Sequence, residues 1–323
     1  YDIAQCLVGS EMCIRDRAHP ARSARLQCAG HEPVLKARLC RLRGADPLLC
    51  RRRGRTHHAE AAGGRGVKPP RGGRLPEREA VSLLQRGEGE DLVFLHGYLA
   101  CKESFYYQIE ALSARFRVTA FDFWGMGRSA PLREAWSVSD YAAHTLALLD
   151  ELGISRAFLL AHSFGGRVAL KLLAGEPQRF PYALLTGCAG IPPRRGAGYA
   201  VRVKAYRAVR RVAPRFAEKH FGSAEYRTLS PVMKESYKKI VNEDLTPCLS
   251  RIRSRVLYVF GERDTATPPY MAHALHAGTA GSELIFLRGC THYCFCEQPA
   301  RFNAVALEFF PRRSTSREEE LDV

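Results

Sequence analysis

The chain has 323 residues and a formal net charge of +16, a balance that ordinarily suggests a nucleic acid or another anionic partner. Residues 1–78, however, hold 17 Lys or Arg and 7 Asp or Glu, a net +10, which leaves +6 for the other 245 residues. This uneven charge argues against a nucleic-acid-binding domain. No apolar run reaches the roughly 18 residues of a membrane span, so we also expect no stable membrane insertion.

Residues 1–77 have the composition of a disordered or spurious segment. Ala, Arg, Gly and Pro make up 34 of the 58 residues in 18–75, and no hydrophobic period is visible there. An out-of-frame reading of GC-rich DNA produces this composition, and a genuine basic tail is the alternative. The chain start carries no basic region followed by an apolar stretch, so we expect no signal peptide and a cytoplasmic location.

Beyond residue 78, strand-like and helix-like segments alternate, as is typical of a parallel sheet covered by helices. In chain order, we expect strands at residues 80–85, 92–95, 117–121, 157–161, 182–185, 256–260 and 283–287. We expect helices at 137–152 (capped by Ser137 or Ser139), at 167–174, and at 299–310, where Phe302, Val305 and Phe309 would pack inward. The prediction is an α/β fold with a mostly parallel central sheet flanked by helices.

A serine stands at one strand-to-helix junction, in the run Ala161-His162-Ser163-Phe164-Gly165-Gly166. A small residue, any residue, Ser, any residue and Gly between a strand and a helix is the pattern of a nucleophile elbow. Such a turn is sharp and strained, so its flanking positions must be small. It would expose the Ser163 hydroxyl at the carboxyl edge of the sheet, and a plain turn serine is the alternative.

A serine nucleophile needs a base and an orienting acid, and both residue types follow later strands. Asp264 comes just after the strand at 256–260, and His292 lies in the loop after the strand at 283–287. Asp264 could instead cap the next helix, with Glu262 as the fallback acid. His292 could instead be a surface histidine. The order Ser, acid, His is the one expected after such an elbow.

The strand at 92–95 ends in His96-Gly97-Tyr98, where the Gly allows the backbone to turn. The Tyr98 N–H could then face the site beside the Phe164 N–H, and these two groups would form an oxyanion hole. We interpret His96 and His162 as structural residues. We expect Asp122 to tie its Gly-rich loop to backbone N–H groups.

These motifs together resemble the α/β-hydrolase family, in its branch with a serine nucleophile. The resemblance covers roughly residues 80–312 and rests on His96-Gly97, residues 121–129, the Ser163 turn, residues 261–264, and residues 289–292 with Glu297 and Pro299. It implies a triad of Ser163, Asp264 and His292, with Tyr98 and Phe164 as the oxyanion hole. Within the family, the chain is similar to esterases with a helical cap, although Ala161 replaces the commoner Gly.

Residues 191–251 break the alternation of strands and helices, and we expect them to form an inserted helical cap. There Val201, Ala205, Ala208 and Val212 recur on one helix face, which would pack on the core. Candidate substrate-binding residues are Tyr199, Tyr206 and Phe105, each of which could equally be core. The remaining boundaries are a hydrolase core at 78–190 and 252–312 and a charged tail at 313–323.

The expected reaction is hydrolysis of carboxylic esters or thioesters with small to medium acyl groups, through an acyl-enzyme and without a cofactor. Cys290, Cys294 and Cys296 surround His292, but their spacing fits no common zinc pattern, so we expect no metal site. The same triad also serves C–C bond hydrolases of ring-cleavage diketones and acyltransferases, which fold-level analogy does not separate. A non-catalytic ligand-binding module is a third alternative, but an intact triad argues against it.

Overall fold

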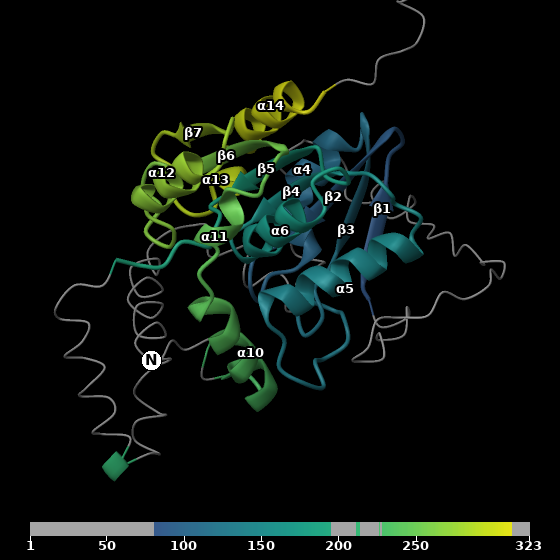
Figure 1. The fold of residues 1–323 in the computed structure, drawn as a ribbon. Coiled ribbons are helices and arrows are strands. Elements are labelled where there is room, and N and C mark those ends of the chain that lie inside the picture. The colour runs from purple at the N-terminus through teal and green to yellow at the C-terminus, as the bar shows by residue number, and fades with distance from the viewer. Residues whose placement is uncertain (1–80, 195–210, 214–225, 227, 312–323) are drawn as a thin grey trace, which may run out of the picture.

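The computed structural model describes residues 81–194, 211–213, 226 and 228–311 (Figure 1). The predicted segment at 1–77, the tail at 313–323, and the candidate residues Tyr199 and Tyr206 all lie outside the described residues. None of the helices in the described part of the chain is long and apolar enough to cross a membrane.

A sheet of seven strands organises the described residues, in the order β1-β3-β2-β4-β5-β6-β7 (Figure 1). The strands are β1 Leu83–Arg86, β2 Glu90–Leu95, β3 Phe116–Phe121, β4 Phe158–His162, β5 Tyr182–Thr186, β6 Arg255–Gly261 and β7 Glu283–Leu287. Only β1 runs antiparallel to its neighbour, β3, and all other neighbouring pairs are parallel. The predicted mostly parallel sheet is therefore confirmed.

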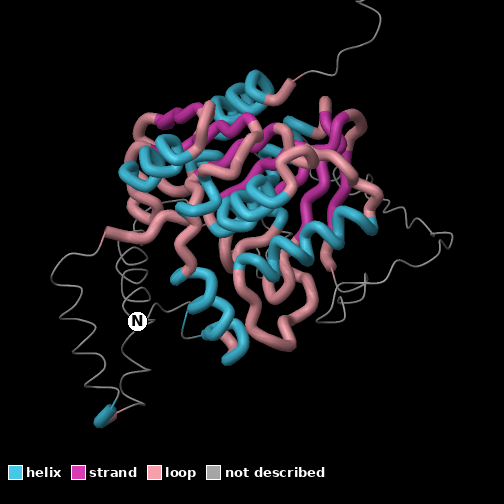
Figure 2. Tube along the Cα trace, viewed as in Figure 1, coloured by secondary structure: helices cyan, strands magenta, loops and turns pink. Residues whose placement is uncertain are grey.

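Helices lie on both faces of this sheet (Figure 2). They are η4 Lys102–Phe105, α4 Tyr106–Leu112, α5 Val138–Glu151, α6 Phe164–Gly175, α10 Pro231–Asn242, α11 Thr246–Leu249, α12 Pro269–Gly278, α13 Cys294–Glu297 and α14 Pro299–Phe309. The predicted helices correspond to α5, α6 and α14. The pattern does not predict α4, because the exposed aromatic residues Tyr106 and Tyr107 obscure its apolar period.

Two apolar cores form because side chains alternate across each strand. Val93 and Leu95 of β2 belong to the core that also contains buried residues of α5, α6 and α12. Leu92 and Phe94 belong to the other core, with α4 and α14. Strands buried on both faces consist of near-continuous apolar residues, which explains why the sequence contains such runs.

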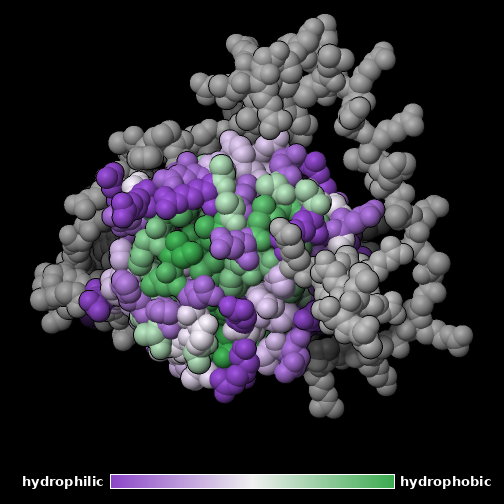
Figure 3. Space-filling model, turned by 90° about the horizontal axis from the view of Figure 1, so that it is seen from above, coloured by the Kyte–Doolittle hydropathy of each residue, from purple (hydrophilic) through white to green (hydrophobic). Residues whose placement is uncertain are grey.

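Helix α14 packs on the second core, as its pattern predicts. Phe302 is fully buried, and Val305 and Phe309 are partly buried against the same cluster. Figure 3 shows the molecule from above, the side on which α14 lies in Figure 1. Hydrophobic residues occupy the centre of this face, and hydrophilic residues surround them.

The connection between β5 and β6 contains the region in which we expect a cap. Its described helices are α10 and α11. Of the predicted apolar stripe, only Val212 lies within the described residues, and it is 86% exposed. The expectation that Val212 packs on the core is therefore wrong. Helix α10 nevertheless contacts the rest of the fold, since the Ser236 hydroxyl donates to the Trp136 carbonyl over 2.7 Å.

Ser137, not Ser139, caps helix α5. The Ser137 hydroxyl accepts a hydrogen bond from the Asp140 N–H, and the Asp140 carboxylate accepts one from the Ser137 N–H. This reciprocal pair is a capping box, which satisfies N–H groups that the first helical turn leaves without partners.

The capping box predicts that Ser137→Ala destabilises the fold by about 1 kcal/mol, because an N–H at the start of α5 loses its acceptor. Urea unfolding followed by circular dichroism would measure the change. The control is Ser139→Ala on the exposed side of the same helix, for which we expect less than about 0.5 kcal/mol. Equal losses in the two variants would contradict the assignment of the cap.

Candidate active site

The turn between β4 and α6 places Ser163 in a strained conformation. Its φ of +51° is one that side-chain-bearing residues rarely adopt. The Ser163 N–H donates to the Thr186 carbonyl over 3.1 Å, and its carbonyl accepts from the Ala189 N–H over 3.2 Å. A Cβ at Gly165 would lie 2.0 Å from the Leu95 carbonyl oxygen, so the motif's glycine is a packing requirement. The sharp turn that the elbow pattern predicts is therefore present.

Asp264 and His292 form a buried hydrogen-bonded pair. The Nδ1 atom of His292 lies 2.8 Å from Oδ2 of Asp264, and both side chains are almost completely buried. Asp264 follows β6 and His292 follows β7, as the sequence predicts, because the carboxyl ends of these parallel strands meet at one edge. An imidazole held this way has Nδ1–H as the donor, which leaves Nε2 free to take a proton.

The Asp264 carboxylate has a full set of donors. Its Oδ1 accepts the N–H groups of Ala266 and Thr267, each over 2.8 Å, and its Oδ2 accepts the Thr267 hydroxyl over 2.7 Å. Burial by itself raises the pKa of Asp264, but His292 and the hydrogen bonds outweigh it and hold the pKa below its ordinary value. Asp264 thus remains ionised at neutral pH.

The alternative acid, Glu262, contacts the backbone of the loop after β7. Its exposed side chain accepts the Gly289 N–H over 2.9 Å, which braces the loop between β7 and His292. Glu297 braces the same loop from its other side by accepting the Thr291 N–H over 2.7 Å. These two carboxylates hold the loop, whereas Asp264 holds the imidazole itself.

His292 lies beside the Ser163 turn. The Nε2 atom of His162 is 3.1 Å from the His292 carbonyl oxygen, and the two rings are 4.7 Å apart between centroids. A Cβ at Gly187 would come within 3.0 Å of the His292 ring. No hydrogen bond joins the Ser163 hydroxyl to His292 among the described residues, and such contacts often tighten only when substrate binds.

The loop after β2 passes over the same turn. A Cβ at Gly97 would lie 3.7 Å from the Ser163 Cβ, and the Tyr98 ring packs edge-on against Phe164 at 5.6 Å. Phe164 is the first residue of α6, where a helix leaves its N–H without an intrahelical acceptor. The two residues predicted to supply oxyanion donors, Tyr98 and Phe164, therefore lie next to the Ser163 turn, and Ser163 itself is half-buried.

Phe105 is not placed to bind substrate. Its side chain is fully buried in the second core, where it contacts Phe94 and Phe295 at centroid distances of 5.2 Å each. The prediction of Phe105 as a lining residue is therefore corrected to a core role. Its aromatic type and its position after the oxyanion loop do not reveal which face of η4 it occupies.

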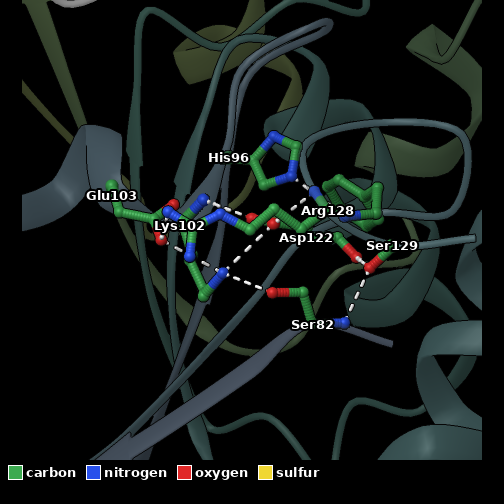
Figure 4. A network of polar contacts seen from close by, with 8 residues as sticks. Ser82, His96, Lys102, Glu103, Asp122, Arg128 and Ser129 are labelled. Carbon is green, nitrogen blue, oxygen red and sulfur yellow. Dashed lines mark hydrogen bonds and ion pairs between the residues drawn. The ribbon is translucent and has the colours of Figure 1, made fainter. Parts of the chain in front are cut away.

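His96 and Asp122 have the structural roles that we predict for them (Figure 4). The Nε2 atom of His96 accepts the Phe123 N–H over 2.9 Å, so its Nδ1–H donates to the Gly97 carbonyl over 2.7 Å. Burial lowers the pKa of His96 to about 4, which keeps the ring neutral. The Asp122 carboxylate accepts the N–H groups of Lys102 and Arg128 over 2.7 and 2.9 Å.

Two further residues contact the carboxylates of Asp264 and Asp122 but belong to no recognisable sequence motif. Thr267 donates its hydroxyl to the acid, and Lys102 buries its ammonium against Asp122 at 3.1 Å. A threonine three residues after a carboxylate in a turn is a weak sequence signal, and a lysine 20 residues before its partner is none.

Cysteines surround His292 without forming a cluster of ligands. Cys290, Cys294 and Cys296 are free thiols. Burial raises the pKa of Cys294 and of Cys296 to about 12. Within the part of the chain that the structure describes, no group of three or more His, Cys, Asp or Glu residues is placed to hold a metal ion.

The Thr267–Asp264 contact predicts a pH-dependent stability. A depressed folded-state pKa stabilises the fold above the unfolded-state value of about 3.9, and this contribution is lost as the pH falls through the folded-state pKa. We therefore expect Thr267→Val to cost about 2 kcal/mol at pH 7, as for a hydrogen bond to a charged group, and less at pH 3.

Urea unfolding at the two pH values measures this difference. The control is Thr279→Val, which removes a buried hydroxyl 2.9 Å from the neutral Tyr258 hydroxyl and should cost the same at both. A Thr267→Val penalty that does not change with pH would contradict a role in stabilising the carboxylate.

Known proteins share sequence similarity with most of the described chain. A model of the alpha/beta hydrolase family matches residues 92–305. A curated relative, the dihydrolipoyllysine-residue acetyltransferase component of an acetoin cleaving system from Cupriavidus necator, is 26% identical over 249 residues. The match covers 70% of this chain and 65% of that protein, so the chain spans less than two thirds of its relative.

Solved structures share the fold. An esterase from Exiguobacterium antarcticum superposes with a TM-score of 0.58 at 22% identity, covering 71% of this chain and 94% of the esterase. A meta-cleavage product hydrolase from Pseudomonas fluorescens gives 0.56 at 21% identity, covering 71% and 93% of the two chains. Because the family model spans well over half of its length, the chain belongs to the alpha/beta hydrolase family.

Proposed function

We propose that this protein is a serine hydrolase that cleaves carboxylic esters or thioesters with small to medium acyl groups. The observation that carries the proposal is the buried Asp264–His292 pair, 2.8 Å apart, beside the strained Ser163 turn. A ligand-binding module would need neither the strain nor the buried pair, and either is costly to maintain.

In the proposed reaction, the Ser163 hydroxyl attacks the substrate carbonyl while the His292 imidazole takes its proton. The N–H groups of Tyr98 and Phe164 hold the resulting oxyanion. His292 then protonates the leaving group, and the acyl group remains on Ser163. Water, deprotonated by His292, releases the acid and restores the serine. Asp264 fixes the imidazole tautomer and stabilises its charged form, and no step requires a metal or an organic cofactor.

The choice of an ester as substrate rests on the leaving group. The similar structures include an esterase and a meta-cleavage product hydrolase by name, and a relative is named as a dihydrolipoyllysine-residue acetyltransferase component. A carboxylic ester is the simplest substrate for these groups, because its alkoxide leaving group needs only the proton that His292 carries. An assay panel should therefore also contain a ring-cleavage diketone and an acyl acceptor other than water.

Ser163→Ala should abolish both fluorophosphonate labelling and turnover of short p-nitrophenyl esters, because it removes the hydroxyl that forms the proposed acyl-enzyme. Mass spectrometry of the labelled full-length protein would locate the adduct at Ser163. Ser155→Ala, at an exposed position before β4, is the control and should be labelled like the unmodified protein.

Two results would contradict this prediction. Labelling of folded Ser163→Ala at the normal rate would reject the nucleophile. Labelling of the unmodified protein without ester turnover, but with cleavage of the diketone or acyl transfer, would replace the esterase with one of the other two activities.

Asp264→Asn should lower kcat for ester hydrolysis by about 10⁴-fold, because the amide favours the wrong imidazole tautomer. Glu262→Gln, a matched change in the same loop, should stay within about threefold, since a glutamine oxygen still accepts the Gly289 N–H. Steady-state kinetics on one ester decides between the two acids. The assignment fails if Glu262→Gln is the more damaging change.

A further inference from the structure

The turn that carries Tyr98 is itself strained. The Ala100 N–H donates to the Gly97 carbonyl over 3.1 Å, and within this turn Leu99 has a φ of +55°. Leucine is unfavourable in this left-handed region, and the Leu99 side chain is 39% exposed, so its own burial does not compensate. Neighbouring groups must therefore hold the turn in place.

The two ends of this turn are tied to two consecutive residues just after β3, one end to Phe123 and the other to Asp122 (Figure 4). On the entry side, His96 accepts the Phe123 N–H over 2.9 Å. On the exit side, the Lys102 N–H donates to Asp122 Oδ1 over 2.7 Å, and the Lys102 ammonium lies 3.1 Å from Asp122 Oδ2. The segment between the two ties is five residues long, 97–101, and contains the strained Leu99.

We call the His96–Phe123 and Lys102–Asp122 contacts the clamp on this turn. Its buried acceptor, Asp122, is itself firmly held. Its side chain is fully buried, and its Oδ2 also accepts the Arg128 N–H over 2.9 Å. Its own carbonyl accepts the Ser129 hydroxyl over 2.6 Å. A Cβ at Gly127 would lie 2.4 Å from the carboxylate, so the surrounding loop closes tightly on it.

The Lys102 ammonium is held behind the turn rather than offered to a substrate. It donates to the Ser82 hydroxyl over 2.6 Å and to Asp122, and lies 3.2 Å from a Glu103 carboxylate oxygen. Its side chain is 8% exposed. With its donors engaged by three residues, Lys102 can act on the reaction only through the backbone that it holds.

We propose that Lys102 is a positioning residue, whose ion pair with Asp122 holds the 97–101 turn in the strained conformation that brings Tyr98 beside Ser163. The inference rests on the proposed function for its kinetic consequence, whereas the clamp itself is a property of the fold. Removing the ammonium should relax the turn and misplace one oxyanion donor, without changing Ser163, His292 or Asp264.

The test compares Lys102→Met, Lys102→Arg and Arg179→Met in the full chain. Lys102→Met should lower kcat by about 10- to 100-fold with KM changed less than about threefold, since one oxyanion donor is misplaced rather than removed. The Ki of a trifluoromethyl ketone, which forms an oxyanion on the serine, should rise by the same factor as kcat/KM falls. Lys102→Arg keeps the charge and should restore most of the loss.

Arg179→Met is the control, because it removes another ion pair of a mostly buried cation, with Arg179 Nη1 2.6 Å from Asp150 Oδ1, and this pair does not touch the turn. It should lower stability but leave kcat and the ketone Ki unchanged. If Lys102→Met does not fold, Lys102→Gln takes its place, since its amide still donates to Asp122 without the charge. Unchanged kcat and Ki in the Lys102 variants, or equal kcat losses in the Arg179 variant, would overturn the proposal.

Hydrogen exchange separates failure of this inference from failure of the proposed function. The amides of Ala100 and residue 102 should exchange at least about tenfold faster in Lys102→Met than in the unmodified protein, whether or not any ester is cleaved. Unchanged protection of these two amides overturns the clamp. If the unmodified protein shows no labelling and no turnover, the esterase proposal is rejected instead. The exchange result then still decides whether the clamp exists.

Discussion

The site depends on one unfavourable backbone conformation, that of Ser163. A non-glycine residue in such a conformation costs roughly 1–3 kcal/mol, so it persists only where its surroundings determine it completely. Here the Thr186 carbonyl fixes its N–H and the Ala189 N–H fixes its carbonyl. The absence of a side chain at Gly165 lets α6 begin against the end of β2. The sheet and the helix together hold a hydroxyl where neither alone would place it.

Two buried carboxylates, each just after a strand of the sheet, are held in the same way. Asp264 after β6 and Asp122 after β3 each accept two backbone N–H groups and each bind one side chain from a distant segment. Burial by itself raises the pKa of both carboxylates. It is outweighed by His292 and the hydrogen bonds at Asp264, and by the two N–H groups and the Lys102 charge at Asp122, so both pKa values lie below their ordinary value and both groups are ionised. The ionised group then orients its partner, His292 in one case and Lys102 in the other.

The sequence predicts the three positions of the proposed triad because each one follows a strand. In a parallel sheet the carboxyl ends of the strands share one edge, so chain order alone brings Ser163, Asp264 and His292 to the same region. It also predicts that His96 and Asp122 are structural, since a Gly-rich turn needs side chains to satisfy its backbone.

Other features do not follow from local pattern. Phe105 lies in a short 3-10 segment, whose buried face depends on Phe94 and Phe295 from separate elements. The Lys102–Asp122 pair joins residues that only the adjacency of β2 and β3 brings together. No local rule predicts that a lysine will be buried, because lysine is almost always exposed unless it is paired.

The Tyr98 side chain links the oxyanion turn to the connection between β5 and β6. Its hydroxyl donates to the Met233 carbonyl of α10 over 3.2 Å, and its ring lies 5.2 Å from that of Tyr237 on the same helix. In the proposed reaction the Tyr98 backbone N–H binds the oxyanion, while its side chain contacts α10. Under the proposed function, mutations that move α10 would therefore also displace Tyr98 and with it a proposed oxyanion donor, so a change in this connection would also alter turnover.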